Sequence, residues 1–169
     1  MGKLIAAPKS VRHGGYSYLI LLLVIAVTMI STSVVSRVAS QLHQRAMEKE
    51  LIFRGEQYRR AIKSFYETGT PRRYPRSIDD LLLDPRFVSI HHLRKPWGDP
   101  MGGPNGEWRM VLNASGNIVG VVSKSDGRPI KKSGFPSNLS HFEDAETYED
   151  WVFAHDPQNL ILKESNFFP

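Results

Sequence analysis

The feature that most constrains this chain is an uncharged stretch from Gly14 to Ser36. Residues 19–27, at its centre, are all apolar. A helix needs about 20 mainly apolar residues to cross a bilayer, and a charged group at that depth costs several kcal/mol. The stretch therefore predicts one transmembrane segment over residues 16–36. A helix buried in a protein core and a secretory signal cut near Ser36 are the less favoured alternatives.

The charges around this stretch predict its orientation. Lys3, Lys9 and Arg12 lie within residues 1–15, which contain no acid. The positive-inside rule therefore predicts a cytoplasmic amino terminus and a carboxyl-terminal domain on the far side of the membrane. The formal net charge is +5, but beyond residue 15 the 19 bases and 17 acids nearly balance. This balance favours membrane lipid as a partner and argues against nucleic acid.

The stretch is predicted to begin a much longer helix, over residues 16–68. No proline occurs between Pro8 and Pro71, and Gly55 is the sole glycine inside this range. The first part, residues 16–36, is the predicted transmembrane half, and residues 37–68 form an amphipathic half. Apolar residues recur there at helical spacing and predict one buried face. These are Met47, Leu51, Tyr58, Ile62, Phe65 and Tyr66, with Glu48 counted among the polar residues between them.

Residues 69–169 are predicted to form a small outer domain. Ser77 and Asp80 have capping-box spacing and predict a short helix over residues 78–83. Alternating apolar residues predict a β-hairpin from residues 108–113 and 118–122, and a further strand from Tyr148 to His155. The expected fold class is α+β, with the outer half of the long helix packed on a small antiparallel sheet.

A basic leader of residues 1–15 ends in Gly14-Gly15 and precedes an apolar helix that starts with Tyr16. This pattern resembles the start of type IV pilins and type II secretion pseudopilins. The resemblance implies that a prepilin peptidase cuts after Gly15 and methylates Tyr16. It also implies that the apolar helix serves both as membrane anchor and as assembly surface. The residues assigned to that role are Leu19, Ile20, Leu22, Val24 and Val27.

A second set of motifs lies in the outer domain. Tyr74-Pro75, the short predicted helix and a Trp97-Gly98-Asp-Pro100 loop occur in that order. They resemble the outer domain of major pseudopilins. The resemblance implies a pseudopilin subunit in the bacterial inner membrane, with its outer domain in the periplasm. Its implied partners are other pilin-like subunits and an inner-membrane assembly platform, with which it forms a short filament for protein export.

The chain departs from this family at two places. Most members carry a glutamate where this chain has Ile20, and that acid resembles a charge partner for the neighbouring subunit's terminal amine. Major pseudopilins also have an acid-rich calcium loop, whereas residues 124–132 hold one acid and four bases. Calcium requires several oxygen ligands with net negative charge. We therefore predict no cofactor, with calcium at the acidic residues 143–150 as the less favoured alternative.

The remaining candidates for chemistry are weak. His91 and His92 are adjacent, so in a strand their side chains would point to opposite faces and chelate poorly. Both are predicted to lie on the surface.

The chain has no cysteine and no nucleophile, phosphate-loop or zinc-protease motif. We therefore predict that it is not an enzyme. A minor pilin of a type IV pilus and a single-pass anchored binding protein remain the alternatives to a pseudopilin.

Overall fold

The computed structural model describes residues 15–103 and 105–155, without the side chains of residues 30–36. The chain divides into two units, residues 1–42 and residues 43–169. Helix α1 runs from Tyr16 to Thr68 and contributes to both units. The prediction of one unbroken helix over these residues is confirmed. The predicted leader of residues 1–15 lies, apart from Gly15, outside the described residues.

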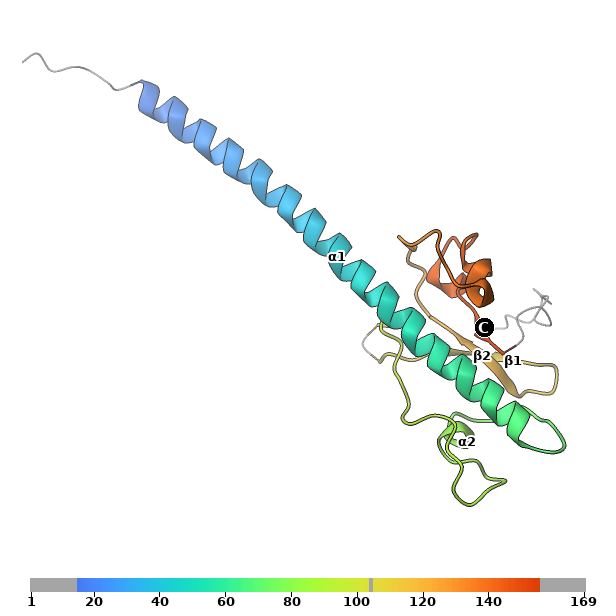
Figure 1. The fold of residues 1–169 in the computed structure, drawn as a ribbon. Helices are drawn as coiled ribbons and strands as arrows, with labels where there is room; N and C mark the ends of the chain where they lie inside the picture. Colours follow the sequence, from blue (N-terminus) through green and yellow to red (C-terminus); the bar gives the residue numbers. More distant parts are fainter. Residues whose placement is uncertain (1–14, 104, 156–169) are drawn as a thin grey trace, which may run out of the picture. The chain divides into compact units, whose positions relative to one another are not determined.

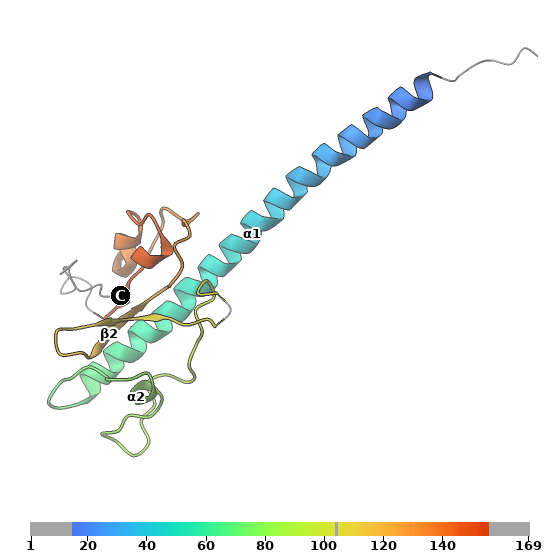
Figure 2. The ribbon, with the colours of Figure 1, turned by 180° about the vertical axis from the view of Figure 1, so that it is seen from behind.

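The second unit is an α+β domain built on a three-stranded antiparallel sheet. Its strands are β1 (Arg109–Leu112), β2 (Ile118–Val122) and β3 (Phe153–Ala154), paired in the order β1-β2-β3. The part of α1 in this unit runs alongside the sheet, and the short helix α2 (Asp79–Leu82) lies near the end of α1 (Figures 1 and 2). Two 3₁₀ helices, η1 (Ser137–Phe142) and η2 (Tyr148–Asp150), precede β3.

The core forms where one face of α1 meets the sheet and the 3₁₀ segments. The buried positions of α1 recur every three or four residues, at Glu48, Leu51, Gly55, Tyr58, Ile62 and Phe65, with Ala61 buried beside them. They pack with β2, which is buried along its whole length, and with the ring of Phe153 in β3. Phe142 stacks on Trp151 at 5.2 Å and meets Phe153 edge-on at 5.0 Å. These rings close the core on the side of η1 and η2.

The buried face of α1 differs from the predicted one at five positions, two of which are the small residues Gly55 and Ala61, buried without having been predicted. Met47 and Tyr66 are only partly buried, while Glu48 is buried at 3% exposure. The placement of Glu48 on the polar face was therefore wrong. Its position three residues before Leu51 puts it on the same face as the apolar core, where a carboxylate requires hydrogen-bond donors.

The predicted capping pair of α2 is confirmed. The amide of Asp80 donates to Ser77 Oγ at 3.3 Å, and the amide of Ser77 donates back to Asp80 Oδ2 at 3.2 Å. These reciprocal bonds satisfy donors that the helix start would leave free. The helix is one residue shorter at each end than predicted, and Leu81 anchors it in the core.

The predicted hairpin is confirmed, but its first strand does not alternate to the end. A β-bulge between Val111 and Leu112 shifts the pairing with β2. The pairing skips Val119, so two residues of β2 face one of β1 here, and Leu112 at the end of β1 is 54% exposed. Gly116 adopts a left-handed φ of +75° in the turn that follows, where a side chain would be strained.

The prediction of a strand from Tyr148 to His155 was too long. Residues 148–150 form η2, and only Phe153 and Ala154 pair with β2. Local capping explains the difference, because the Asp150 carboxylate accepts bonds from the amide of Thr147 at 2.8 Å and from its hydroxyl at 2.9 Å. This arrangement favours a helical turn over an extended strand.

Gly55 allows α1 to approach β3 closely, and this closeness can be tested. A Cβ placed on Gly55 would lie 2.5 Å from the Phe153 ring. Alanine favours a helix by about 1 kcal/mol over glycine, but overpacking a core costs about 1–3 kcal/mol. We expect Gly55→Ala to lower the free energy of unfolding by about 1 kcal/mol net, measured by urea denaturation. Lys63→Ala, at an exposed position of the same helix, should change it little; a stabilised Gly55→Ala variant would contradict the close packing.

Candidate assembly surface

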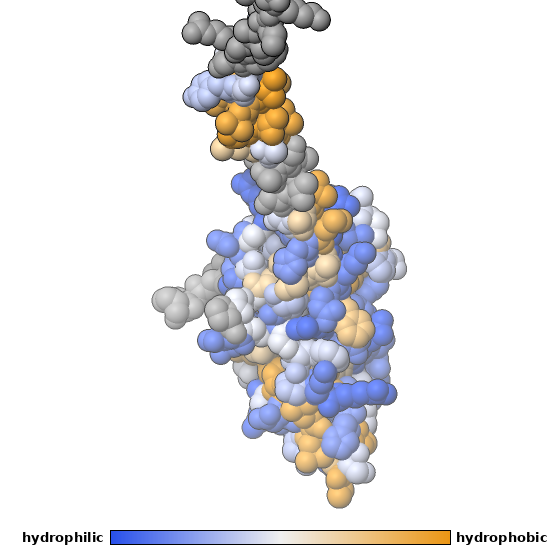
Figure 3. All heavy atoms as spheres, turned by 90° about the vertical axis from the view of Figure 1, so that its left-hand side faces the viewer, coloured by the Kyte–Doolittle hydropathy of each residue, from blue (hydrophilic) through white to orange (hydrophobic). Residues whose placement is uncertain are grey.

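The described part of α1 in the first unit carries large apolar side chains all around the helix. Those from Tyr16 to Met29 form one uncharged run with exposed fractions from 41% to 76%, and Val38 and Leu42 follow beyond Arg37. Consecutive residues of a helix point about 100° apart, so the unbroken run from Leu19 to Ile25 covers every direction. No acidic or basic residue interrupts it. Figure 3 shows this segment as a band of hydrophobic residues.

The residues predicted for processing and assembly lie in this band or at its start. Gly15 lies in the turn before α1, and Tyr16 is its first residue. The assembly residues are all exposed; these are Leu19, Ile20, Leu22, Val24 and Val27. Ile20 is 60% exposed, so the position at which the resemblance expects an acid presents an apolar side chain instead. The hydroxyl residues Ser31, Thr32, Ser33 and Ser36 lie outside the described side chains.

Among the described residues, no helix has an apolar stretch long enough to cross a membrane. Residues 30–36 of the predicted span lie outside the described side chains.

The exposed apolar band is unfavourable in water. Removing a large apolar side chain from water contributes about 1.5–3 kcal/mol. Monomeric soluble proteins rarely keep a contiguous apolar surface of this kind, and such surfaces mark contact with another protein or with lipid. The band from Tyr16 to Met29 is therefore suited to burial against apolar partners, since it contains no aspartate, glutamate, lysine, arginine or histidine.

The Trp97-Gly98 loop connects α1 to the sheet. The Trp97 carbonyl accepts bonds from the Tyr58 hydroxyl at 2.8 Å and from the Trp108 indole at 2.9 Å. The Gly98 carbonyl accepts a bond from Arg54 at 2.7 Å. One short segment thus holds two residues of α1 and the residue that precedes β1. This contact gives the Trp97 motif a structural role at the helix–sheet junction.

The Tyr74-Pro75 step makes a second connection. Tyr74 stacks on Tyr66 of α1 with ring centroids 4.6 Å apart, and the buried Pro75 accepts a bond from the Ile118 amide at 2.8 Å. The step therefore joins the end of α1 to the start of β2. Both predicted outer-domain motifs lie against α1, while Pro100 follows in the same loop as Trp97.

Asp99 is a buried carboxylate that organises the Trp97 loop. It accepts bonds from the Met101 amide at 2.8 Å, from the Ser123 hydroxyl at 2.7 Å and from the Lys124 amide at 3.2 Å. The bond to the amide two residues on is an Asx turn. The Asp99-Pro100 pair signals such a turn in the sequence, but its burial depends on Ser123, which is distant in sequence.

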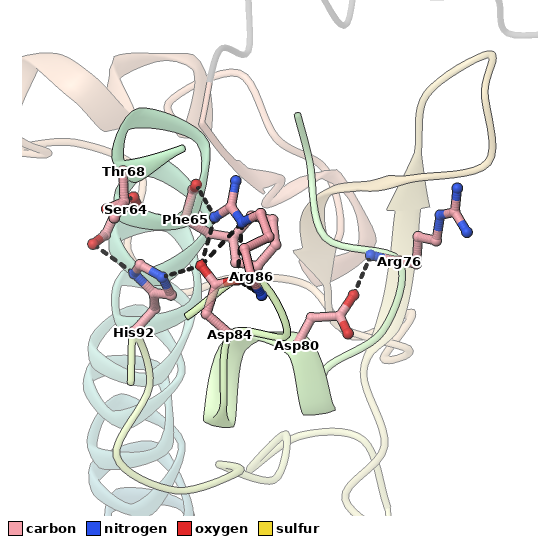
Figure 4. A network of polar contacts seen from close by, with 8 residues as sticks. All are labelled: Ser64, Phe65, Thr68, Arg76, Asp80, Asp84, Arg86 and His92. Carbon is pink, nitrogen blue, oxygen red and sulfur yellow. Dashed lines mark hydrogen bonds and ion pairs between the residues drawn. The ribbon is translucent and has the colours of Figure 1, made fainter. Parts of the chain in front are cut away.

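A second buried carboxylate, Asp84, holds the loop after α2 against the end of α1 (Figure 4). Its side chain is fully buried and pairs with Arg86, whose guanidinium Nη2 lies 2.6 Å from Asp84 Oδ2. Arg86 also donates to the Phe65 carbonyl at 2.7 Å and lies 3.8 Å from the centre of the Phe65 ring. His92 Nε2 lies 3.1 Å from the same carboxylate, and its Nδ1 lies 2.8 Å from Ser64 Oγ.

This cluster corrects the prediction for the histidine pair. His91 is exposed as predicted, but the His92 side chain is 2% exposed and belongs to the Asp84 cluster. The Asp84-Pro85 step was the available signal for a turn here. The cluster also fixes a loop whose Val88 is fully exposed.

Two pKa shifts follow from these environments. Arg86 beside Asp84 holds the pKa of that carboxyl far below its usual range, against the opposing effect of burial. Burial raises the pKa of Tyr58 above its usual value of 10.0, since the neutral phenol is favoured away from water. Both groups therefore keep their usual charge states at neutral pH.

Candidate ligand groups are sparse. Within the described residues, no group of three or more histidine, aspartate or glutamate side chains is placed to hold a metal ion. In the acidic region of residues 143–150, Asp150 caps η2 and Glu149 pairs with Arg109 at 3.1 Å.

Comparison of the chain with known protein families, with curated proteins and with solved structures finds no match.

The Asp84 cluster predicts a specific dependence of stability on pH. The carboxyl pKa is lower in the folded than in the unfolded chain, where it is about 3.9. As pH falls, the unfolded state binds the proton first, so the stabilisation is complete above about pH 5 and declines below about pH 4. We expect Asp84→Asn to destabilise the protein by about 3 kcal/mol at neutral pH, because it leaves Arg86 buried without its anion.

Thermal or urea unfolding between acidic and neutral pH measures this effect. The destabilisation by Asp84→Asn should shrink as pH falls through the acidic range. Asp79→Asn is the matched control, because Asp79 is an exposed acid of α2. Equal losses from the two variants, or a loss from Asp84→Asn that does not vary with pH, would contradict the role given to the cluster.

Proposed function

We propose that this protein is a pseudopilin subunit of a type II secretion-like apparatus. The observation that supports this most is the exposed, uncharged band from Tyr16 to Met29 on the same helix whose last part forms the core of the outer domain. The apolar band of such a helix can move from contact with lipid to contact with other subunits. The last part of the helix remains packed in the folded outer domain throughout. The outer-domain motifs and the Gly14-Gly15-Tyr16 start support the same proposal.

In this proposal, a prepilin peptidase removes the leader after Gly15 and methylates the new amino terminus at Tyr16. The apolar helix then stores the subunit in the inner membrane, with the outer domain in the periplasm. An inner-membrane assembly platform extracts the subunit, and helices of neighbouring copies cover one another. Burial against protein replaces burial in lipid, so helix packing costs little hydrophobic free energy.

Ile20 changes how packing would be specified. With an apolar residue there, no ion pair with a neighbour's amino terminus is available to set the position of an incoming subunit. The position of an incoming subunit would then depend on close packing of side chains. Apolar contacts in a bundle are less directional than a charge pair. The proposed filament therefore depends on the shape of the band around Ile20, Leu22 and Val24.

The decisive experiment is mass spectrometry of the mature amino terminus, from cells that contain a prepilin peptidase. We expect a chain that starts at N-methylated Tyr16. Gly15→Leu should abolish the cut, because the resemblance places the cleaved bond after this glycine, and Gly14→Ala should leave it intact. An unprocessed Met1 would replace the proposal by a plain anchored protein, and a cut near Ser36 would replace it by a secreted one.

Assembly has a separate test, made simple by the absence of cysteine. In cells that contain the secretion machinery, Val24→Cys should form covalent dimers with a membrane-permeant bis-maleimide, because neighbouring helices would bury this side chain against one another. Each chain then has one thiol, so one cross-linker joins two chains. Ser115→Cys, at the exposed hairpin turn, should remain monomeric. Monomers alone from Val24→Cys would contradict helix packing. A further test compares the neighbouring genes: genes for an assembly ATPase and an outer-membrane channel beside this one would distinguish a secretion system from a pilus.

A further inference from the structure

We infer that a buried carboxylate of α1, Glu48, fixes the loop of residues 124–132 to the helix in place of calcium. The proposed function and its family resemblance imply a calcium ion for this loop. The residues present do not fit such an ion. The contacts of Glu48 instead supply, from the protein itself, the restraint that a metal would give.

Glu48 reaches the loop from a position about 80 residues earlier in the chain. Its Oε1 accepts hydrogen bonds from the backbone amides of Ile130 and Lys131, the latter at 3.4 Å. The same oxygen accepts a bond from the Tyr148 hydroxyl at 2.9 Å. Hydrogen bonds to an ionised acceptor are stronger than neutral ones, and three donors meet at one oxygen of a residue that is only 3% exposed.

Gln44, one turn earlier on α1, adds a second restraint. Its side-chain amide donates to the Tyr148 hydroxyl at 2.9 Å and to the Arg128 carbonyl at 3.0 Å. Residues four apart lie on the same face of a helix, so Gln44 and Glu48 contact the loop together. Burial, with a further contribution from Glu48, raises the pKa of Tyr148 to about 12, so its hydroxyl remains a donor at physiological pH.

The loop itself is unsuited to calcium. Calcium takes six to eight oxygen ligands, usually including several carboxylates. Among residues 124–132 the sole acid is Asp126, which is exposed, while four residues are basic. Two of the loop's lysines bond to carbonyl oxygens: Lys131 Nζ donates to Gly134 at 3.1 Å and Lys132 Nζ to Ala145 at 2.5 Å. A divalent cation would meet these ammonium groups, which repel it.

The experiment uses three basic residues of the loop as trypsin sites; these are Lys124, Lys131 and Lys132. Arg128 is not a site, because trypsin does not cut before Pro129. The full-length chain in detergent is digested briefly, with excess calcium or with a calcium chelator, and the first cuts are mapped by mass spectrometry. For the unaltered chain we expect equal cutting rates in this loop, and melting temperatures within about 1 °C, in the two conditions, since no bound ion stabilises the fold.

Glu48→Ala should raise the cutting rate in the loop by about tenfold or more, equally with calcium or chelator, because the loop opens when its charged acceptor is lost. Tyr148→Phe removes one donor only and should raise the rate less. Glu50→Ala is the matched control, since Glu50 lies on α1 in a partly exposed pair with Arg54. If Glu48→Ala unfolds the whole domain, Tyr148→Phe alone carries the test.

Two results would overturn the inference: faster cutting or a lower melting temperature of the unaltered chain when calcium is removed, or unchanged loop cutting in both Glu48→Ala and Tyr148→Phe. Neither result depends on how the amino terminus is processed. Failure of the inference is therefore distinguishable from failure of the proposed function, which the mass of the mature chain tests.

Discussion

The outer domain depends on one face of α1, from Glu48 to Phe65, being buried against the sheet. Gly55 permits the close approach to Phe153, and Tyr58 reaches the carbonyl of Trp97 through its hydroxyl. Within about five turns of helix, this face supplies apolar side chains to the core, a close contact with Phe153 and a hydrogen bond to the Trp97 loop. The same helix carries the exposed band of the first unit, from Tyr16 to Met29.

Three buried carboxylates tie loops to this framework. Asp84 holds the segment after α2, Asp99 organises the Trp97 loop, and Glu48 fixes residues 128–131. Regular structure accounts for little of the outer domain, so its long connections need such anchors. A buried carboxylate is costly unless donors surround it, and each of these three has backbone amides as partners. This common pattern explains how a small sheet supports so much irregular chain.

Much of this fold could be predicted from the sequence, because local signals determine it. The absence of proline between Pro8 and Pro71 predicted one long helix where α1 lies. The Ser77–Asp80 spacing predicted α2, and the alternation of apolar residues predicted the hairpin. The errors have non-local causes. Glu48 is buried against partners 82 to 100 residues away, and His92 lies between Asp84 and Ser64, which is 28 residues earlier on α1; periodicity reveals neither arrangement. The sequence alternates apolar and polar residues where the structure has a β-bulge beside Leu112 and a turn capped by Asp150. Alternation alone therefore predicted regular strands at both places. The assembly role of the apolar band remains a prediction.

The bond from Tyr148 to Glu48 joins residues 100 positions apart, and the rings of Trp151 and Phe153 enter the core from still later in the chain. A domain dominated by such distant pairings folds slowly, since the loop entropy is lost before the contacts form. The amphipathic half of α1 is synthesised early, whereas the rings of Tyr148, Trp151 and Phe153 that complete its cover come from the last part of the core. Until residue 154 has emerged, that cover is incomplete, so part of the helix face remains open to contact with another protein.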